Sequence, residues 1–221
     1  MIEVDATAQE ARQRRRTWML GGALFAASAL IGLALRSVLL QSQLVPDLLF
    51  VAGVVVFAIG LGRAGSVTAR RPLGTTALVA LAVWLLVASP LQQLLLPMAV
   101  TFDDADGRGY FQLINMVGMT IQVVALALAI IAVVQIGRIG VVPKPWAWAP
   151  LWALGAVIVA RTLLSGMLPM PALAYDQQAL GVLFGLAGLL VAASIAFLGV
   201  LAMILAVRPV PGSTVVYASN V

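Results

Sequence analysis

The chain contains no cysteine and no histidine, and only 10% of its 221 residues are charged. The lack of cysteine excludes disulfide bonds and thiolate chemistry, and the lack of histidine removes the most common general base and metal ligand. Apolar residues make up 62% of the chain, whereas soluble domains are about 45–50% apolar and about 25% charged. A water-soluble fold of this composition could not cover its apolar surface. The sequence therefore predicts an integral membrane protein, with no metal and no cofactor.

Long apolar segments predict how the chain crosses the membrane. A spanning helix needs about 20 mostly apolar residues, whereas the strands of a membrane barrel are shorter and alternate in polarity. Six segments have the required length and continuous apolar character. We predict an all-α fold, a bundle of six transmembrane helices at residues 18–40, 47–62, 75–100, 110–136, 148–168 and 178–207, between tails at 1–17 and 208–221.

The distribution of charge predicts the orientation of this bundle. The two tails and the loops that share their side carry ten basic and three acidic residues. The opposite side, with Arg161 counted there, carries three basic and five acidic residues. Because basic residues are retained on the cytoplasmic side of a membrane, we predict that both termini are cytoplasmic.

Two features bear on the source of the chain and on its partners. The turn at residues 137–143 (Gly-Arg-Ile-Gly-Val-Val-Pro) resembles loops of multi-helix membrane proteins of high-GC bacteria, and the ratio of twelve arginines to one lysine agrees with this resemblance. The resemblance implies location in a bacterial cytoplasmic (inner) membrane. The basic residues are scattered over short loops rather than gathered in one folded module, so we expect no nucleic-acid partner.

A short internal similarity links residues 61–67 and 136–142, which share the pattern Gly-Arg-x-Gly-x-Val. Each copy is predicted to end a helix at the cytoplasmic surface, where glycine relaxes the last turn and arginine complements the negative end of the helix dipole. Two interpretations remain open. The similarity reflects either the duplication of a helix hairpin or the common requirements of two helix ends.

Small residues recur along the last apolar segment at steps of three and four. In lipid, close approach of two backbones through small residues drives helix association. A shorter series, Gly22 and Ala26, lies in the first segment. We predict that 178–207 packs centrally in the bundle against 18–40, and a homodimer interface is the alternative. The face consists of Gly181, Gly185, Gly188, Ala192, Ala196 and Gly199.

Arg161 is the one clear charge inside a predicted span. Its insertion costs about 2.5–3.5 kcal/mol, so we expect it to face the bundle interior. Amide side chains fall at similar depth on neighbouring helices, with Gln92, Gln93 and Asn115 level with it and Gln122 deeper. These residues form either an outward-facing pocket for a polar or anionic ligand or a layer of interhelical hydrogen bonds.

The acidic residues bear on function, because all eight lie in tails, in loops or at a span end. Proton- and cation-coupled mechanisms rely on acidic or histidine side chains inside the membrane. The acidic loop at 103–109 lacks two of the oxygen ligands of a calcium loop. We therefore predict neither catalytic residues nor metal ligands, and not an enzyme.

These observations lead to two functional hypotheses. The first is a non-catalytic subunit, surrounded by membrane lipids, that assembles with other membrane proteins or with itself through 178–207. The alternative is a small transporter or channel with an outward-facing polar pocket around Arg161.

Overall fold

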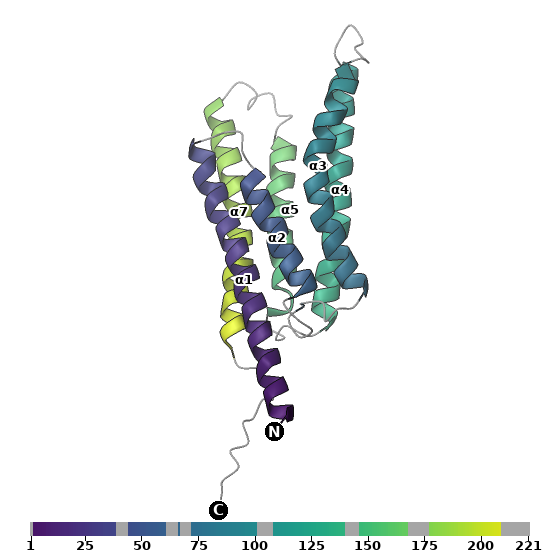
Figure 1. Cartoon of the computed structure of the whole chain (residues 1–221). Helices are drawn as coiled ribbons and strands as arrows, with labels where there is room; N and C mark the ends of the chain where they lie inside the picture. Colours follow the sequence, from purple (N-terminus) through teal and green to yellow (C-terminus); the bar gives the residue numbers. More distant parts are fainter. Residues whose placement is uncertain are drawn as a thin grey trace, which may run out of the picture.

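A computed structural model of the chain is built from helices that run alternately up and down (Figure 1). It describes residues 2–38, 44–60, 66, 72–100, 108–139, 146–167 and 177–208, without the side chains of 2–8, 36–38, 89, 92–93, 95–100, 108–115, 139, 161, 163–167, 177 and 180. All the regular structure in these ranges is helical, which confirms the all-α part of the prediction there. The helices are α1 (Ile2–Val38), α2 (Leu44–Ile59), α3 (Pro72–Val100), α4 (Arg108–Ile139), α5 (Ala149–Met167) and α7 (Gln177–Val207).

The helix bounds lie within three residues of the predicted segments, except at the start of α1. This helix begins at Ile2 and runs through most of the predicted tail. Residues 2–17 contain neither glycine nor proline and are rich in alanine, glutamine, glutamate and arginine, which favour helix. The tail therefore continues the first helix, and Figure 1 shows this part of α1 extending past the other helices.

Three of the described helical segments are long and apolar enough to cross a membrane: Gln9–Leu35, Met116–Arg138 and Gly181–Val207. Shorter apolar stretches occur at Leu44–Ile59, Pro72–Ala88 and Ala149–Ala160. The first and last of the three long segments lie side by side, because α1 and α7 pack along each other.

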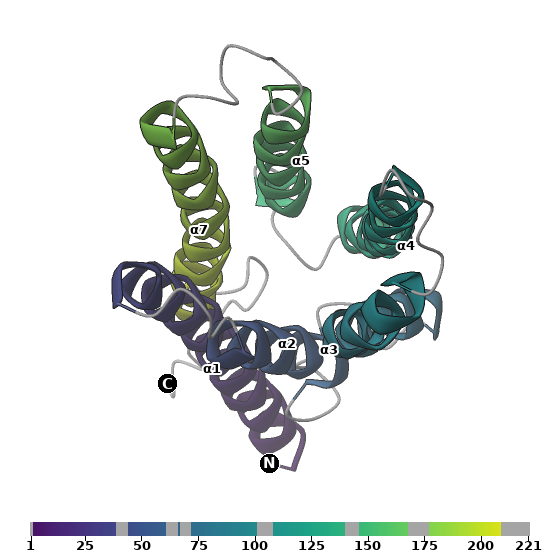
Figure 2. The ribbon, with the colours of Figure 1, turned by 90° about the horizontal axis from the view of Figure 1, so that it is seen from above.

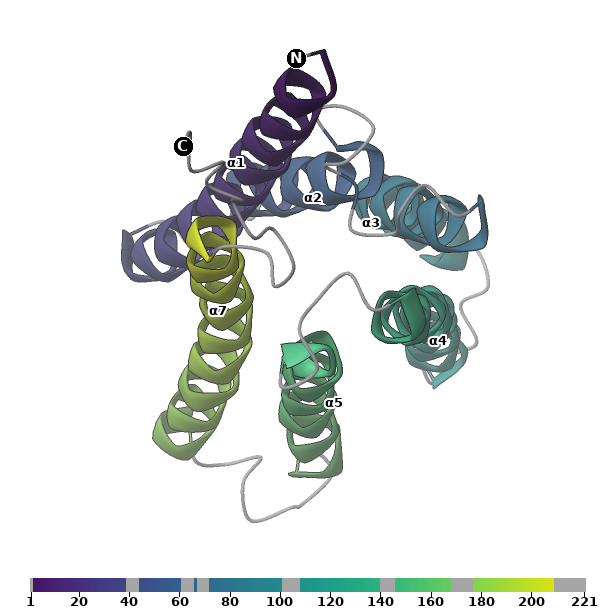
Figure 3. The same cartoon turned by 90° about the horizontal axis from the view of Figure 1, so that it is seen from below.

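The helices form a ring, seen from its two ends in Figures 2 and 3. Each helix packs against the next in chain order, and α7 closes the ring against α1. The contact between α1 and α7 is the most extensive, and the contact between α4 and α5 is the slightest of the six. We predicted a central position for α7, but α7 takes a place in the ring between α5 and α1.

The apolar core lies toward the end of the ring where α1 begins and α7 ends (Figure 1). Fewer of the described side chains toward the other end are buried, and Leu30, Leu94 and Met116 are 66%, 68% and 62% exposed. The ring is therefore packed more closely at one end than at the other. The buried cluster includes Trp18, Phe25, Val51, Val54, Phe57, Ala77, Leu78, Ala132, Ile136, Ala149, Leu201 and Leu205.

The end of α2 shows how the two similar segments differ. Gly60 follows the helix with a φ of 70° and donates its N–H to the carbonyl of Val56 at 2.9 Å, a glycine helix cap. The hydroxyl of Ser66 donates to the carbonyl of Ala58 at 2.7 Å. The helix thus ends before residue 61, so the prediction that the first copy ends it is wrong. In the second copy, by contrast, residues 136–139 lie within α4.

Candidate functional site

The backbones of α1 and α7 approach each other closely at Gly22 and Gly199. A Cβ atom added to Gly199 would lie 2.6 Å from the carbonyl oxygen of Gly22 and 2.8 Å from the amide nitrogen of Ala26. A Cβ atom added to Gly22 would likewise lie 2.6 Å from the carbonyl oxygen of Gly199. Both positions thus require glycine because backbone atoms occupy the space.

The other small residues of α7 have different surroundings. Gly188 is buried, and Ala192 and Ala196 are half-buried. Gly181 and Gly185 are exposed, and within the described part of the chain no heavy atom of a neighbouring element lies within 4 Å of the place of a Cβ. The part of the face near Gly199 is therefore used by the fold itself, and no described residue covers the part near Gly185.

The predicted polar layer extends over three helices, and most of its side chains lie outside the described residues. Gln92 and Gln93 belong to α3, Asn115 to α4 and Arg161 to α5. The side chain of Gln122, on α4, is described and is exposed. The positions of these residues along the ring axis can therefore be compared only from the backbone. Two residues at the same height along this axis are called level.

Two contacts set the register of α3, α4 and α5. The indole N–H of Trp84 donates to the carbonyl of Ile121 at 3.1 Å, which places these residues level with each other. Gly137 packs on the ring of Trp148, with 3.3 Å between its added Cβ and the nearest ring atom. This second contact sets the level of α5 against α4.

Counting 1.5 Å per residue from these contacts divides the predicted layer into two levels. Arg161 lies about 20 Å and Gln122 about 22 Å from the level of the Gly137–Trp148 contact, so their backbones are nearly level. Asn115 lies about 9 Å above Ile121, and Gln92 lies about 12 Å above Trp84, in the same direction. We predicted that Arg161 shares its level with Asn115 and Gln92, but its backbone is level with Gln122.

Gln122 lies on a face of α4 whose residues become buried where the helix approaches the core. It precedes Val133 by three helical turns, so both residues are on the same side of the helix, and Val133 is 9% exposed. Gln122 itself is exposed. A polar side chain thus lies uncovered by described residues on α4, the helix whose contact with α5 is slight.

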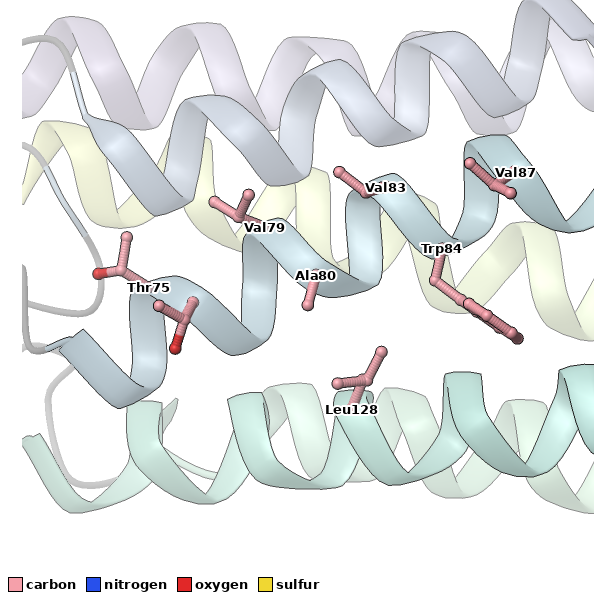
Figure 4. Close-up of a pocket in the computed structure, with 8 residues that line it drawn as sticks. Thr75, Val79, Ala80, Val83, Trp84, Val87 and Leu128 are labelled. Atoms are coloured by element: carbon pink, nitrogen blue, oxygen red, sulfur yellow. The ribbon is translucent and has the colours of Figure 1, made fainter.

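A groove with a volume of about 540 Å³ runs along α3 beside α4 (Figure 4). In Figure 4, Ala80 and Trp84 point toward α4, and Leu128 of α4 points back toward α3. Val79 and Val83 line the other side. The lining is almost entirely apolar and offers no described charge. Sequence reasoning missed this groove, although the exposed valines of α3 recur at steps of four residues.

Replacing Trp84 with phenylalanine is expected to lower the free energy of unfolding by about 1 kcal/mol, because it removes the hydrogen bond between α3 and α4. The matched control is Trp152→Phe, since Trp152 is 78% exposed and loses the same atoms. Thermal or denaturant unfolding of the purified chain in detergent measures both. Equal effects of the two substitutions would contradict a role for this bond.

Several described charged side chains lie at helix ends, and the others lie in the first part of α1. Asp47 is in the first turn of α2 and Arg138 in the last turn of α4, where each complements the helix dipole. Arg208 follows α7, and an arginine-rich segment, residues 12–16, lies in the extended part of α1. In the ranges that the structure covers, no three acidic, cysteine or histidine residues gather into a potential metal site.

Comparison of the chain with protein-family models, with curated proteins and with solved structures finds no match.

Proposed function

We propose that this protein is a non-catalytic subunit of a bacterial cytoplasmic membrane that assembles through α7. The observation that carries the proposal is the pair Gly181 and Gly185, which no described residue covers. This pair continues the face that packs against α1 at Gly199, and its four-residue spacing suits close approach of another helix. A membrane helix with small residues of its own would fill the open space, whether it belongs to another protein or to a second copy.

The proposal includes six spans and cytoplasmic termini. The start of α1 and the end of α7 lie at the same end of the ring (Figure 1). The described basic residues at 12–16, 138 and 208 lie toward that end, and Asp47 begins α2 near the other end. The positive-inside rule supports a cytoplasmic position for the basic end.

The test is to purify the tagged full-length chain in mild detergent and to measure which proteins co-purify with it. The amounts are compared between wild type and the variants. Gly185→Leu is expected to reduce the amount of its partner about tenfold, because the larger side chain keeps the second helix away. The matched control is Gly155→Leu on α5, which also has open space around it and lies outside the α7 face. Copies carrying two different tags distinguish self-association from assembly with another protein.

Two outcomes would contradict the proposal. In one, wild type and Gly185→Leu retain the same partner in equal amount. In the other, Gly155→Leu and Gly185→Leu lose it equally, which would indicate a general effect of added leucine.

Gln122 favours a second candidate, a small transporter or channel. Its exposed amide is carried by a residue that is level with the backbone of Arg161. The same face of α4 is buried nearer the core, at Val133. A polar group there suits a ligand that enters between α4 and α5. Solute release from liposomes containing the wild-type chain, lost on Gln122→Leu, would favour this candidate over the subunit.

A further inference from the structure

The helix α1 has one packed face and one free face. Its packed face contacts α2 and α7 and contains Trp18, Gly22 and Phe25. The opposite face is exposed at Leu20 (45%) and Leu30 (66%), and Ala23 between them is also exposed. This free face is an apolar strip about 15 Å long from Leu20 to Leu30, at 1.5 Å per residue. That length equals about one leaflet of the hydrocarbon core.

Two arginines continue the same strip toward the start of α1. At about 100° per residue, Arg12 and Arg16 lie on the side of Leu20 and Ala23 rather than on the packed side. Both side chains are exposed. The acidic Glu10 projects at least about 120° around the helix from either of them. The free face of α1 is therefore basic at its start and apolar beyond.

Arg14 belongs to the other side of the helix. Its guanidinium lies 5.4 Å from the centre of the Trp18 ring, within the range of a cation–π contact. The neighbouring arginines on the free face are directed away from this contact. The arginines of this segment thus divide into one that packs against the bundle and others that face outward.

We propose that the free face of α1 binds an anionic phospholipid of the surrounding bilayer. Arg12 and Arg16 would hold its phosphate, since guanidinium groups suit phosphate oxygens, and one acyl chain would lie along Leu20, Ala23 and Leu30. The order of charge and apolar surface along the helix matches the order of headgroup and chain in the lipid. This inference requires α1 to lie in a bilayer and does not depend on the partner proposed for α7.

Native mass spectrometry of the full-length chain tests the proposal, with an equal mixture of phosphatidylglycerol and phosphatidylcholine that carry the same acyl chains. The wild-type chain is expected to retain phosphatidylglycerol preferentially. Arg12→Gln with Arg16→Gln is expected to reduce this preference about tenfold, since it removes both guanidinium groups that would hold the phosphate. Excess inorganic phosphate is expected to leave the lipid bound.

The control is Arg138→Gln with Arg208→Gln, which removes the same charge from exposed positions at the same end of the bundle. It is expected to change the lipid preference less than about twofold. Equal loss in the two double variants would overturn the proposal in favour of a general charge effect. Full retention in Arg12→Gln with Arg16→Gln, or displacement by inorganic phosphate, would also overturn it.

Discussion

Replacing Gly199 with leucine is expected to lower the free energy of unfolding by about 3 kcal/mol, at the upper end of the usual cost of overpacking. The reason is that a Cβ atom at this position meets backbone atoms of Gly22 and Ala26 at 2.6 and 2.8 Å. Backbone atoms of a packed helix cannot relieve the overlap by changing rotamer, as a side chain can. The two helices must separate, and α7 then loses its most extensive contact.

The matched control for this substitution is Gly185→Leu on the same helix. No described neighbour lies within 4 Å of that position, so the free energy of unfolding is expected to change by less than about 1 kcal/mol. Unfolding in mixed micelles with increasing denaturing detergent measures both variants. If Gly199→Leu is as stable as Gly185→Leu, the result would contradict the close approach of the α1 and α7 backbones at Gly199.

Phe57→Ala is expected to destabilise the bundle by about 3 kcal/mol, the usual cost of emptying a buried aromatic position. Phe57 is 9% exposed, and its ring centre lies 5.3 Å from that of Phe25 and 6.2 Å from that of Trp18. It also fills the space above Gly21, with 2.7 Å between its ring and an added Cβ. The substitution therefore removes two of the aromatic contacts between α1 and α2.

Phe184→Ala provides the comparison, because Phe184 is 50% exposed on α7 and loses the same atoms. Its effect on the free energy of unfolding is expected to be less than about 1 kcal/mol. The same unfolding titration measures both variants. Equal destabilisation by the two substitutions would contradict the aromatic cluster as a main contact of α1 with α2.

The positions of the helices could be predicted from the sequence because long apolar segments and their breaks are local properties. The spacing of glycine and alanine on α7 also predicted a packing face that includes Gly199. Spacing marks a face of one helix, however, and not the place at which the other helix crosses it. The division between the used part at Gly199 and the uncovered part at Gly185 depends on that crossing.

Contacts with backbone carbonyls could not be predicted. The hydroxyl of Ser28 donates to the carbonyl of Pro46 at 2.8 Å, and the indole of Trp84 donates to the carbonyl of Ile121. Every residue carries such an acceptor, so the sequence contains no signal for the partner. The level of Arg161 was misjudged for a related reason. Depth was counted from the ends of the predicted spans, whereas the register between helices depends on contacts such as that of Gly137 with Trp148.

The unequal packing of the ring determines where the molecule can bend. Large apolar side chains of five helices, among them Trp18 of α1, Val54 of α2, Leu78 of α3, Ile136 of α4 and Leu205 of α7, interlock around one end, and a closely packed core resists deformation. Toward the other end fewer of the described side chains are buried, so fewer contacts hold the helices together there. The packed end is therefore expected to deform less than the other end. Because α4 and α5 contact each other slightly, a change in their separation is expected to cost less than a change between α1 and α7.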